Sequence, residues 1–303
     1  MCGIIGFVDK LARRDFATGQ VVLAMLEALG CRGPDSAGVA MLRERPQGEA
    51  WRVRIAPPEA EVLSRIQGLG HVEGALIQGD SLSFRFEAHA GVTPEAVEKA
   101  LGACRGGLEV LGMGTRLDLV KQVGTPSRLE GTYGISSWRG PLAIGHTRMS
   151  TESRIDLSHS QPFWAHGVLD LASVHNGHVT NYHQLRRWYE QAGVTFYTDN
   201  DSEVIGVYLR DRLDRGRSLD EALADSIRDL DGAFNFLVAS AEGLGVVRDR
   251  FGFKPLVMAE TDEFLAVATE EIALRRALPG NYRVFEPPIG RASFYPLEAP
   301  ALV

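Results

Sequence analysis

Alternating and helical patterns of apolar residues along the chain predict a mixed α and β protein. An apolar run at 3–8 indicates a buried strand, and apolar residues at helical spacing predict a helix over 17–29 that stops at Gly30. Further strand-like runs lie at 234–239, 244–247, 256–258 and 264–268. The short turns between those later runs favour an antiparallel sheet.

The stretch at 41–140 differs from the rest because proline and glycine are scattered through it and its predicted elements are short. Alternation at 82–86 predicts a strand, and a Thr-Pro pair at 93–94 predicts the start of a helix. A second short helix is predicted over 116–123. We interpret the stretch as an α+β insertion within a single domain that covers 2–303.

Beyond the insertion, polar residues gather in the loops that follow predicted strands. Strands are predicted at 142–145 and 169–174, each followed by a polar segment. Apolar spacing at 185–189 predicts one helix, the polar loop at 198–203 caps a second, and Ser218 opens a third with a capping box.

The composition is that of an ordinary globular protein, with 303 residues of which 45% are hydrophobic and 23% charged. The net charge of −7 argues against nucleic acid or an anionic membrane as a partner. No apolar stretch approaches the roughly 20 residues that a membrane-spanning helix needs. The three cysteines, Cys2, Cys31 and Cys104, form no CxxC pair, which favours a reducing cytoplasm.

Cys2 is the first candidate for chemistry. Removal of Met1 would leave one residue that carries both a thiol and a free α-amine, a group whose pKa is typically about 8. An N-terminal amine that acts as the base for its own side-chain nucleophile is a known catalytic arrangement. On these residues alone, an ordinary cysteine near a chain start explains the position equally well.

Other positions carry groups that suit attack on a carbonyl. The Asn176-Gly177 pair offers a side-chain amide and an open backbone N–H at the exit of a strand, as an oxyanion hole does, although Asn-Gly is also a common turn pair. Arg148 can clamp a carboxylate and Asp201 can accept from an ammonium, a combination that suits a free amino acid. Each of these two can also be a plain surface or helix-capping residue.

Several histidines share one segment, so a metal-binding module is a further alternative. They are His146, His159, His175 and His178. No pair has the spacing of an HExxH helix, and no thiolate cluster accompanies them. We therefore interpret them as core or hydrogen-bonded loop histidines and expect no metal.

Seven motifs in order resemble those of the class II glutamine amidotransferases, which are N-terminal nucleophile hydrolases. They are CGIIG at 2–6, RGPDSAG at 32–38, GHTRMST at 145–151, HNGHVTN at 175–181, TDNDSEV at 198–204, RDRFGFKPL at 248–256 and ATEEIALR at 268–275. The resemblance covers essentially the whole chain except the insertion.

The resemblance implies a fold and a reaction. The fold is an α+β four-layer αββα sandwich with two antiparallel sheets. In the reaction, Cys2, freed of Met1, attacks the side-chain amide of L-glutamine with its own α-amine as base. Ammonia leaves, and a γ-glutamyl thioester is then hydrolysed to glutamate.

The resemblance also implies roles for the matched positions. Asn176 and Gly177 match the oxyanion hole. Arg148 matches the clamp on the substrate α-carboxylate, and Asp201 matches the acceptor of its α-ammonium. The loop after Arg148 matches a lid that closes over substrate. The remaining matches around the glutamine pocket are Arg32 and Thr151.

The chain departs from many members of this family at Cys31, where a histidine is common, and in the length of its insertion. It ends at Val303 with no synthase domain behind it, so we expect ammonia-accepting synthase subunits as partners. The motif wording is most similar to the amidotransferase subunit of glutamate synthase-like complexes such as N-methylglutamate synthase. That likeness implies a flavin and an iron–sulfur centre in partner subunits, and no cofactor in this chain. A catalytically silent regulatory or scaffold subunit is the alternative, and the filled catalytic positions argue against it.

Overall fold

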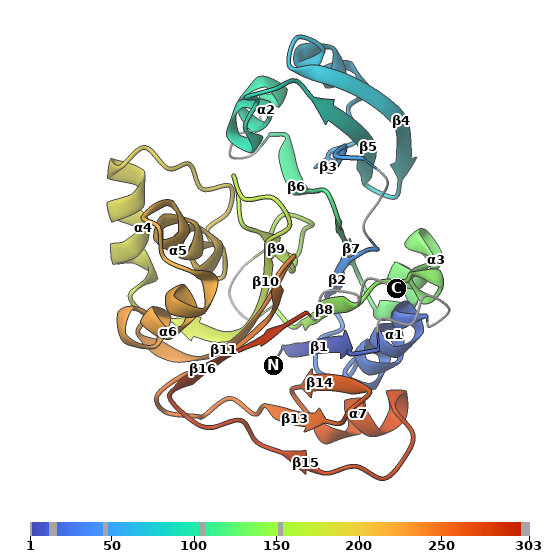
Figure 1. Cartoon of the computed structure of the whole chain (residues 1–303), viewed down its shortest axis with the longest axis vertical. Helices are drawn as coiled ribbons and strands as arrows, with labels where there is room; N and C mark the ends of the chain where they lie inside the picture. Colours follow the sequence, from blue (N-terminus) through green and yellow to red (C-terminus); the bar gives the residue numbers. More distant parts are fainter. Residues whose placement is uncertain (1, 12–16, 45–47, 103–106, 151–153, 298–303) are drawn as a thin grey trace.

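The computed structural model describes residues 2–11, 17–44, 48–102, 107–150 and 154–297, and two antiparallel sheets form its centre (Figure 1). The seven-stranded sheet has the strand order β15-β13-β14-β1-β8-β2-β7, and the five-stranded sheet has the order β16-β12-β11-β10-β9. The first comprises β1 (Gly3–Asp9), β2 (Ser36–Leu42), β7 (Leu117–Val123), β8 (Leu142–Arg148), β13 (Val257–Glu260), β14 (Phe264–Ala268) and β15 (Val284–Phe285). The second comprises β9 (Phe163–Trp164), β10 (Ala172–Val179), β11 (Gly232–Ser240), β12 (Gly243–Arg248) and β16 (Arg291–Pro296).

Helices cover the outer face of each sheet. On the seven-stranded sheet these are α1 (Thr18–Ala28), α3 (Pro126–Tyr133) and α7 (Glu271–Ala277), with the short 3-10 turn η2 (Ile135–Ser137). On the five-stranded sheet they are α4 (Tyr182–Gln191), α5 (Glu203–Asp214) and α6 (Leu219–Asp229). The four layers confirm the predicted αββα sandwich (Figure 1).

A third, four-stranded sheet lies apart from the two central ones, at the top of Figure 1. Its strand order is β4-β5-β3-β6, and η1 and α2 pack beside it. Its elements are β3 (Trp51–Ala56), η1 (Ala60–Ile66), β4 (Gly70–Gln78), β5 (Ser81–Ala88), α2 (Pro94–Leu101) and β6 (Glu109–Gly114).

The inserted sheet occupies the middle of the stretch at 41–140, whose two ends belong to the seven-stranded sheet and to the helices that cover it. The last residues of β2 lie at one end, and β7 pairs with β2 from the other. The helix predicted over 116–123 is wrong, because Leu117–Val123 form β7. Its apolar residues have spacings that a helix and a buried strand share, and pairing with β2 decides in favour of the strand.

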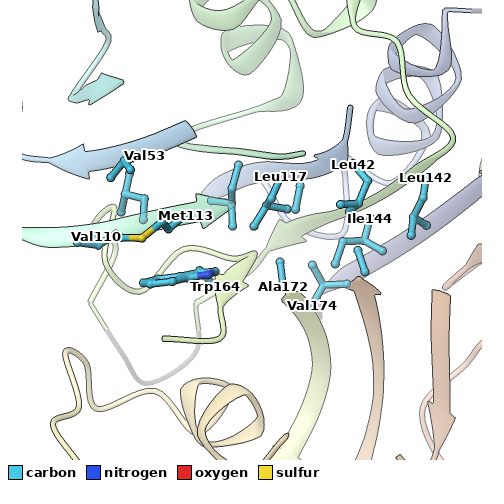
Figure 2. Packing of buried hydrophobic residues seen from close by; sticks show 14 of the residues in the cluster. Leu42, Val53, Val110, Met113, Leu117, Leu142, Ile144, Trp164, Ala172 and Val174 are labelled. Carbon is cyan, nitrogen blue, oxygen red and sulfur yellow. The ribbon is translucent and has the colours of Figure 1, made fainter. Parts of the chain in front are cut away.

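One apolar core fills the space between the two central sheets and continues into the inserted sheet. Ile144 and Val174 pack between the central sheets, while Val53 and Val110 belong to the inserted one. Figure 2 shows these side chains in one contiguous layer. The other labelled members are Leu42, Met113, Leu117, Leu142, Trp164 and Ala172.

Most other predicted elements are confirmed within a residue or two. The strand at 3–8 is β1, the helix at 17–29 is α1, and the alternation at 82–86 is β5. The capping box at Ser218 is present in full, with both reciprocal hydrogen bonds to Glu221. No helix in the described ranges is long and apolar enough to cross a membrane.

Candidate functional site

Cys2 immediately precedes β1, a strand that is paired on both sides. β1 lies between β14 and β8, and all seven of its residues are buried. Thr269 anchors its beginning, because Ile4 N–H donates to Thr269 Oγ1 at 2.8 Å and Thr269 N–H donates to the Ile4 carbonyl at 3.0 Å. Cys2 itself is half-buried, and its Sγ lies 3.8 Å from the Met149 carbonyl oxygen. The thiol is therefore accessible on a fixed strand.

Arg148 lies beside Cys2 as the last residue of β8. Gly3 pairs with Thr147 in antiparallel strands. Cys2, which precedes Gly3, therefore lies opposite Arg148, which follows Thr147. The Arg148 side chain is buried, and its guanidinium donates to the Arg154 carbonyl at 2.8 Å. Burial lowers the pKa of Arg148 from its ordinary value, while Cys2 and nearby carboxylates act in the opposite direction. A buried guanidinium next to a thiol can hold an anionic group at the reacting centre.

The loop after α1 folds back onto these two residues. Arg32 Nε donates to the Cys2 carbonyl at 3.5 Å, and its guanidinium pairs with Glu270. Asp35 fixes the chain after β8, because its N–H donates to the Arg148 carbonyl at 3.0 Å and its Oδ2 accepts from Ser150 N–H at 2.7 Å. The loop ends at Asp35, since Ser36 begins β2.

Asn176 and Gly177 lie within β10 and not at its exit, because the strand continues to Val179. Asn176 is buried, and its Nδ2 has no hydrogen-bond partner among the described residues. Gly177 has φ +137°, and a Cβ there would meet the Ala233 carbonyl oxygen at 2.2 Å. Only glycine fits this position. An unpaired amide donor beside a glycine N–H is what a developing oxyanion requires.

Strand alternation turns the main candidates toward the same space. Ile4, Ile144 and Val174 all lie in the core between the sheets. Residues two positions further along each strand project from the same face. Cys2, one step before Ile4 in this alternation, therefore faces the space between the sheets, and so do the side chains of residues 146 and 148 and of residue 176. β10 contacts both β1 and β8 across this space.

Asp201 sits in the loop between α4 and α5 and is tied to β10. Its Oδ2 accepts from Val179 N–H at 2.8 Å, and its Oδ1 lies 3.9 Å from His175 Nδ1. Ser202 Oγ is 2.8 Å from the same Nδ1 and accepts from Gln161 Nε2 at 3.1 Å. The carboxylate is half-buried and fixed relative to the strand that carries Asn176.

Burial keeps the two inner histidines neutral. It lowers the pKa of His146 to about 3, with His175 and Arg148 acting in the same direction. Burial also lowers the pKa of His175, although Asp201 opposes the shift. Among the described residues, no three His, Cys, Asp or Glu side chains form a group that could hold a metal ion.

The structure thus brings Cys2, Arg32 and Arg148 into one neighbourhood and places Asn176 on the facing strand. Thr151 lies outside the described residues. Asp35, Thr269 and Glu270 were not singled out as site residues from the sequence, although all three lie inside the recognised motifs.

Asn235 is a further residue that the sequence reasoning missed. It pairs with Asn176 across β10 and β11, and its Nδ2 donates to the Lys254 and Pro255 carbonyls at 3.0 and 3.3 Å. A polar residue within the apolar run at 234–239 was the signal for it.

Comparisons with known proteins agree on one family. A family model described as a glutamine amidotransferase domain matches residues 146–276. A protein of Methanothermobacter thermautotrophicus named as a glutamine amidotransferase is 34% identical over 315 residues, covering 94% of this chain and 100% of that protein. A glutamine amidotransferase-like protein of Rhizobium meliloti is 35% identical over 290 residues, covering 95% of each chain.

A solved structure shares the fold. Glutamine phosphoribosylpyrophosphate amidotransferase from B. subtilis matches with a TM-score of 0.61 at 21% sequence identity. The match covers 94% of this chain and 46% of the B. subtilis chain, so this chain spans about half the length of that protein. At this identity the likeness concerns the fold alone.

Proposed function

Because the chain belongs to the class II glutamine amidotransferases, we propose that it releases ammonia from glutamine through a thioester on Cys2 and supplies it to a partner synthase subunit. The observation that carries the proposal is the convergence of Cys2, Arg148 and Asn176 on the space between the two sheets. A nucleophile, a cationic clamp and an unpaired amide donor are the parts that acyl transfer from an amino acid needs.

The first half-reaction forms the thioester. Cys2 Sγ bonds to the side-chain carbonyl carbon of glutamine while the thiol proton passes to the α-amine that Met1 removal exposes. The carbon–nitrogen bond then breaks, and the ammonium returns its proton to the leaving nitrogen, so ammonia departs. In the second half-reaction the same amine takes a proton from water, and the resulting attack releases glutamate and the free thiol.

The oxyanion that forms in both halves would accept from Asn176 Nδ2 and from the Gly177 N–H. The orphaned, buried state of Nδ2 supports this assignment, because a donor that is already in place and unpaired stabilises developing charge without reorganisation. Arg148 would hold the substrate α-carboxylate and Asp201 its α-ammonium. Arg32 and Thr151 complete the pocket in this proposal.

Covalent labelling tests the mechanism. The purified chain, with its N-terminus checked by mass spectrometry, is incubated with glutamine and separately with a glutamine-shaped diazoketone. We expect glutamate and ammonia in equal amounts, one label on Cys2, and neither with Cys2→Ala. Full glutaminase activity in a chain that retains Met1 would contradict the amine as base. If a chain without Met1 takes up no label even with a partner present, the catalytically silent scaffold subunit becomes the better-supported function.

The ammonia acceptor is the second part of the proposal. We infer a glutamate synthase-like partner, such as the other subunits of N-methylglutamate synthase, with a flavin and an iron–sulfur centre in those subunits and a reducing cytoplasm as the setting. The likeness of the chain's motifs to those of the amidotransferase subunit of such complexes supports this acceptor. Ammonia released at neutral pH becomes mostly ammonium, which is not a nucleophile, so direct transfer would conserve it.

Co-expression tests the partner. The chain is produced together with glutamate synthase-like chains and analysed by size-exclusion chromatography and by glutamine-dependent product formation. We expect a stable complex in which Cys2→Ala stops glutamine use but spares turnover with added ammonium salts. A lone monomer with high, unregulated glutaminase turnover in the presence of those chains would rule this acceptor out.

A further inference from the structure

Glu98 on α2 makes buried polar contacts between the inserted segment and the chain beside the five-stranded sheet. The residue is 7% exposed. Its Oε1 lies 2.6 Å from His166 Nδ1 and accepts from the Tyr197 hydroxyl at 2.7 Å. The His166 and Tyr197 rings stack with their centroids 4.4 Å apart. One carboxylate from the insertion thus holds two rings from the chain that follows β9 and α4.

The charge state of this cluster favours tight contacts. Burial acts to raise the pKa of Glu98, but His166, Tyr197 and Arg210 outweigh it, and its pKa lies below the usual value. Burial acts to lower the pKa of His166, but Glu98 outweighs it, and the pKa of His166 is raised. Both shifts favour the charged forms, a carboxylate on Glu98 and an imidazolium on His166. Hydrogen bonds between such charged groups are stronger than neutral ones.

Tyr197 opens the loop that carries Asp201. Its backbone N–H donates to Glu203 Oε1 at 2.7 Å, and the next residue, Thr198, donates to Glu203 Oε2 through both its N–H and its hydroxyl. The Thr198 hydroxyl in turn accepts from Asn200 N–H at 3.1 Å. A continuous series of hydrogen bonds therefore connects Tyr197 with the residue just before Asp201.

Among the described residues, Glu98 is the hydrogen-bond partner of the Tyr197 hydroxyl. A cavity of about 750 Å³ lies beside the ring, between α2 and the helices α4 and α5. Its lining includes Glu98, His166 and Tyr197. If the hydroxyl lost its acceptor, the ring would have space to turn into this cavity, and the start of the loop would lose its outer support.

We propose that Glu98 is a positioning residue for glutamine binding, which holds the Tyr197–Ser202 loop so that Asp201 meets the substrate α-ammonium. The inference rests on the proposed function, and it gives the insertion a part in the reaction. Glu98 touches neither substrate nor reacting atoms in this account. Its effect should therefore appear in the binding of glutamine and not in the chemistry at Cys2.

Steady-state kinetics with three variants test the proposal. Glu98→Ala should raise KM for glutamine about tenfold, or about 1.4 kcal/mol, with kcat changed by less than about twofold. Glu98→Gln keeps an oxygen that accepts from Tyr197 and should recover most of the affinity. Glu95→Ala is the matched control, because Glu95 lies on the same helix and pairs with Arg210 without touching the loop. Its KM should equal that of the wild type.

A second reagent separates positioning from general damage. Iodoacetamide alkylates a thiol but has no α-ammonium for Asp201 to hold, so its rate with Cys2 should be the same in Glu98→Ala and in the wild type. Equal KM values for Glu98→Ala and Glu95→Ala, or a loss confined to kcat, would overturn the proposal. If Glu98→Ala fails to fold, Tyr197→Phe removes only the hydroxyl and must raise KM in its place. A wild-type chain without any glutaminase activity would instead refute the proposed function itself.

Discussion

Cys2 and Arg148 are neighbours because of strand register. The fixed guanidinium of Arg148 suits a planar group such as a carboxylate. Its guanidinium is buried and already bonded to the Arg154 carbonyl, so the side chain cannot rearrange freely around a substrate. Lysine at this position would keep the charge but lose the fork that grips both carboxylate oxygens.

Arg148→Lys should therefore lower kcat/KM for glutamine by about one to two orders of magnitude, which corresponds to the ~1.5–3 kcal/mol of one charge-assisted hydrogen bond. Steady-state assays of ammonia release measure this. Arg154→Lys is the control, since Arg154 contributes its carbonyl and its side chain is exposed. An unchanged kcat/KM in Arg148→Lys would remove this residue from the site.

His146 couples stability to pH. Its folded-state pKa of about 3 lies below the ordinary value of about 6.5. Between these values the unfolded chain binds a proton that the folded chain does not, so the free energy of unfolding rises with pH. This contribution is present in full above about pH 6.5 and is lost as the pH falls towards 3.

Between pH 6.5 and 4, the stability of the wild type should fall more steeply than that of His146→Gln, by up to ~1.4 kcal/mol per pH unit. Urea unfolding at a series of pH values gives the slope. His178→Gln, a change at an exposed position, should behave as the wild type. Parallel curves for the wild type and His146→Gln would show that His146 titrates normally in the folded state.

The sequence could predict the residues that carry chemistry but not those that hold them. Cys2 and Arg148 stand in recognisable motifs. The contacts of Thr269 with Ile4 and of Asp35 with Ser150 join positions 265 and 115 residues apart, and no local pattern encodes such a pairing. Those partners become visible only when the sheet is assembled.

At the scale of elements, β10 places the proposed oxyanion donors on a paired strand and not on a mobile turn. The sequence predicted a strand that ended before His175, because the polar run looks like a loop. Pairing with β11 continues through Val179, and His175 N–H donates to Gln161 Oε1, so these polar residues belong to a strand. A long-range pairing, that of β7 with β2, also explains why the sequence predicted a helix where β7 lies.

Gly177→Ala should destabilise the fold by ~1–3 kcal/mol or more, because the added Cβ would lie 2.2 Å from the Ala233 carbonyl and the φ of +137° is unfavourable for alanine. It should also reduce kcat more than it raises KM, since the N–H would move. Gly216→Ala has a positive φ but open space around it, and it should affect stability alone. Calorimetry and kinetics on both variants provide the comparison, and equal kcat values would argue against an oxyanion role.

At the scale of the whole molecule, the αββα fold could be predicted from its family motifs, whereas the limits of the inserted sheet could not. No motif marks where β2 ends and β3 begins, so the stretch at 41–140 was treated as one piece. The structure shows a division within it, with Trp51–Gly114 around a separate sheet and the two ends in the central sheet and its covering helices.

A cavity made in the inserted sheet should lower the stability of the whole protein. Met113 in β6 is fully buried and belongs to the core that continues from the central sheets into the inserted one. Met113→Ala should lower the free energy of unfolding by ~2–5 kcal/mol. Circular dichroism and loss of glutaminase activity in urea should shift together. Two separate transitions would mean that the inserted sheet unfolds independently.

The continuity of that core bears on how such chains can be recombined (Figure 2). A segment that shared only its two ends with the host could be exchanged between relatives like a loop. Here Val53 and Val110 complete a layer to which Ile144 and Val174 also belong. A chimera that carries the inserted sheet of a relative must therefore bring matching residues from β8 and β10 as well, and a clean deletion would leave half of an apolar layer open to water.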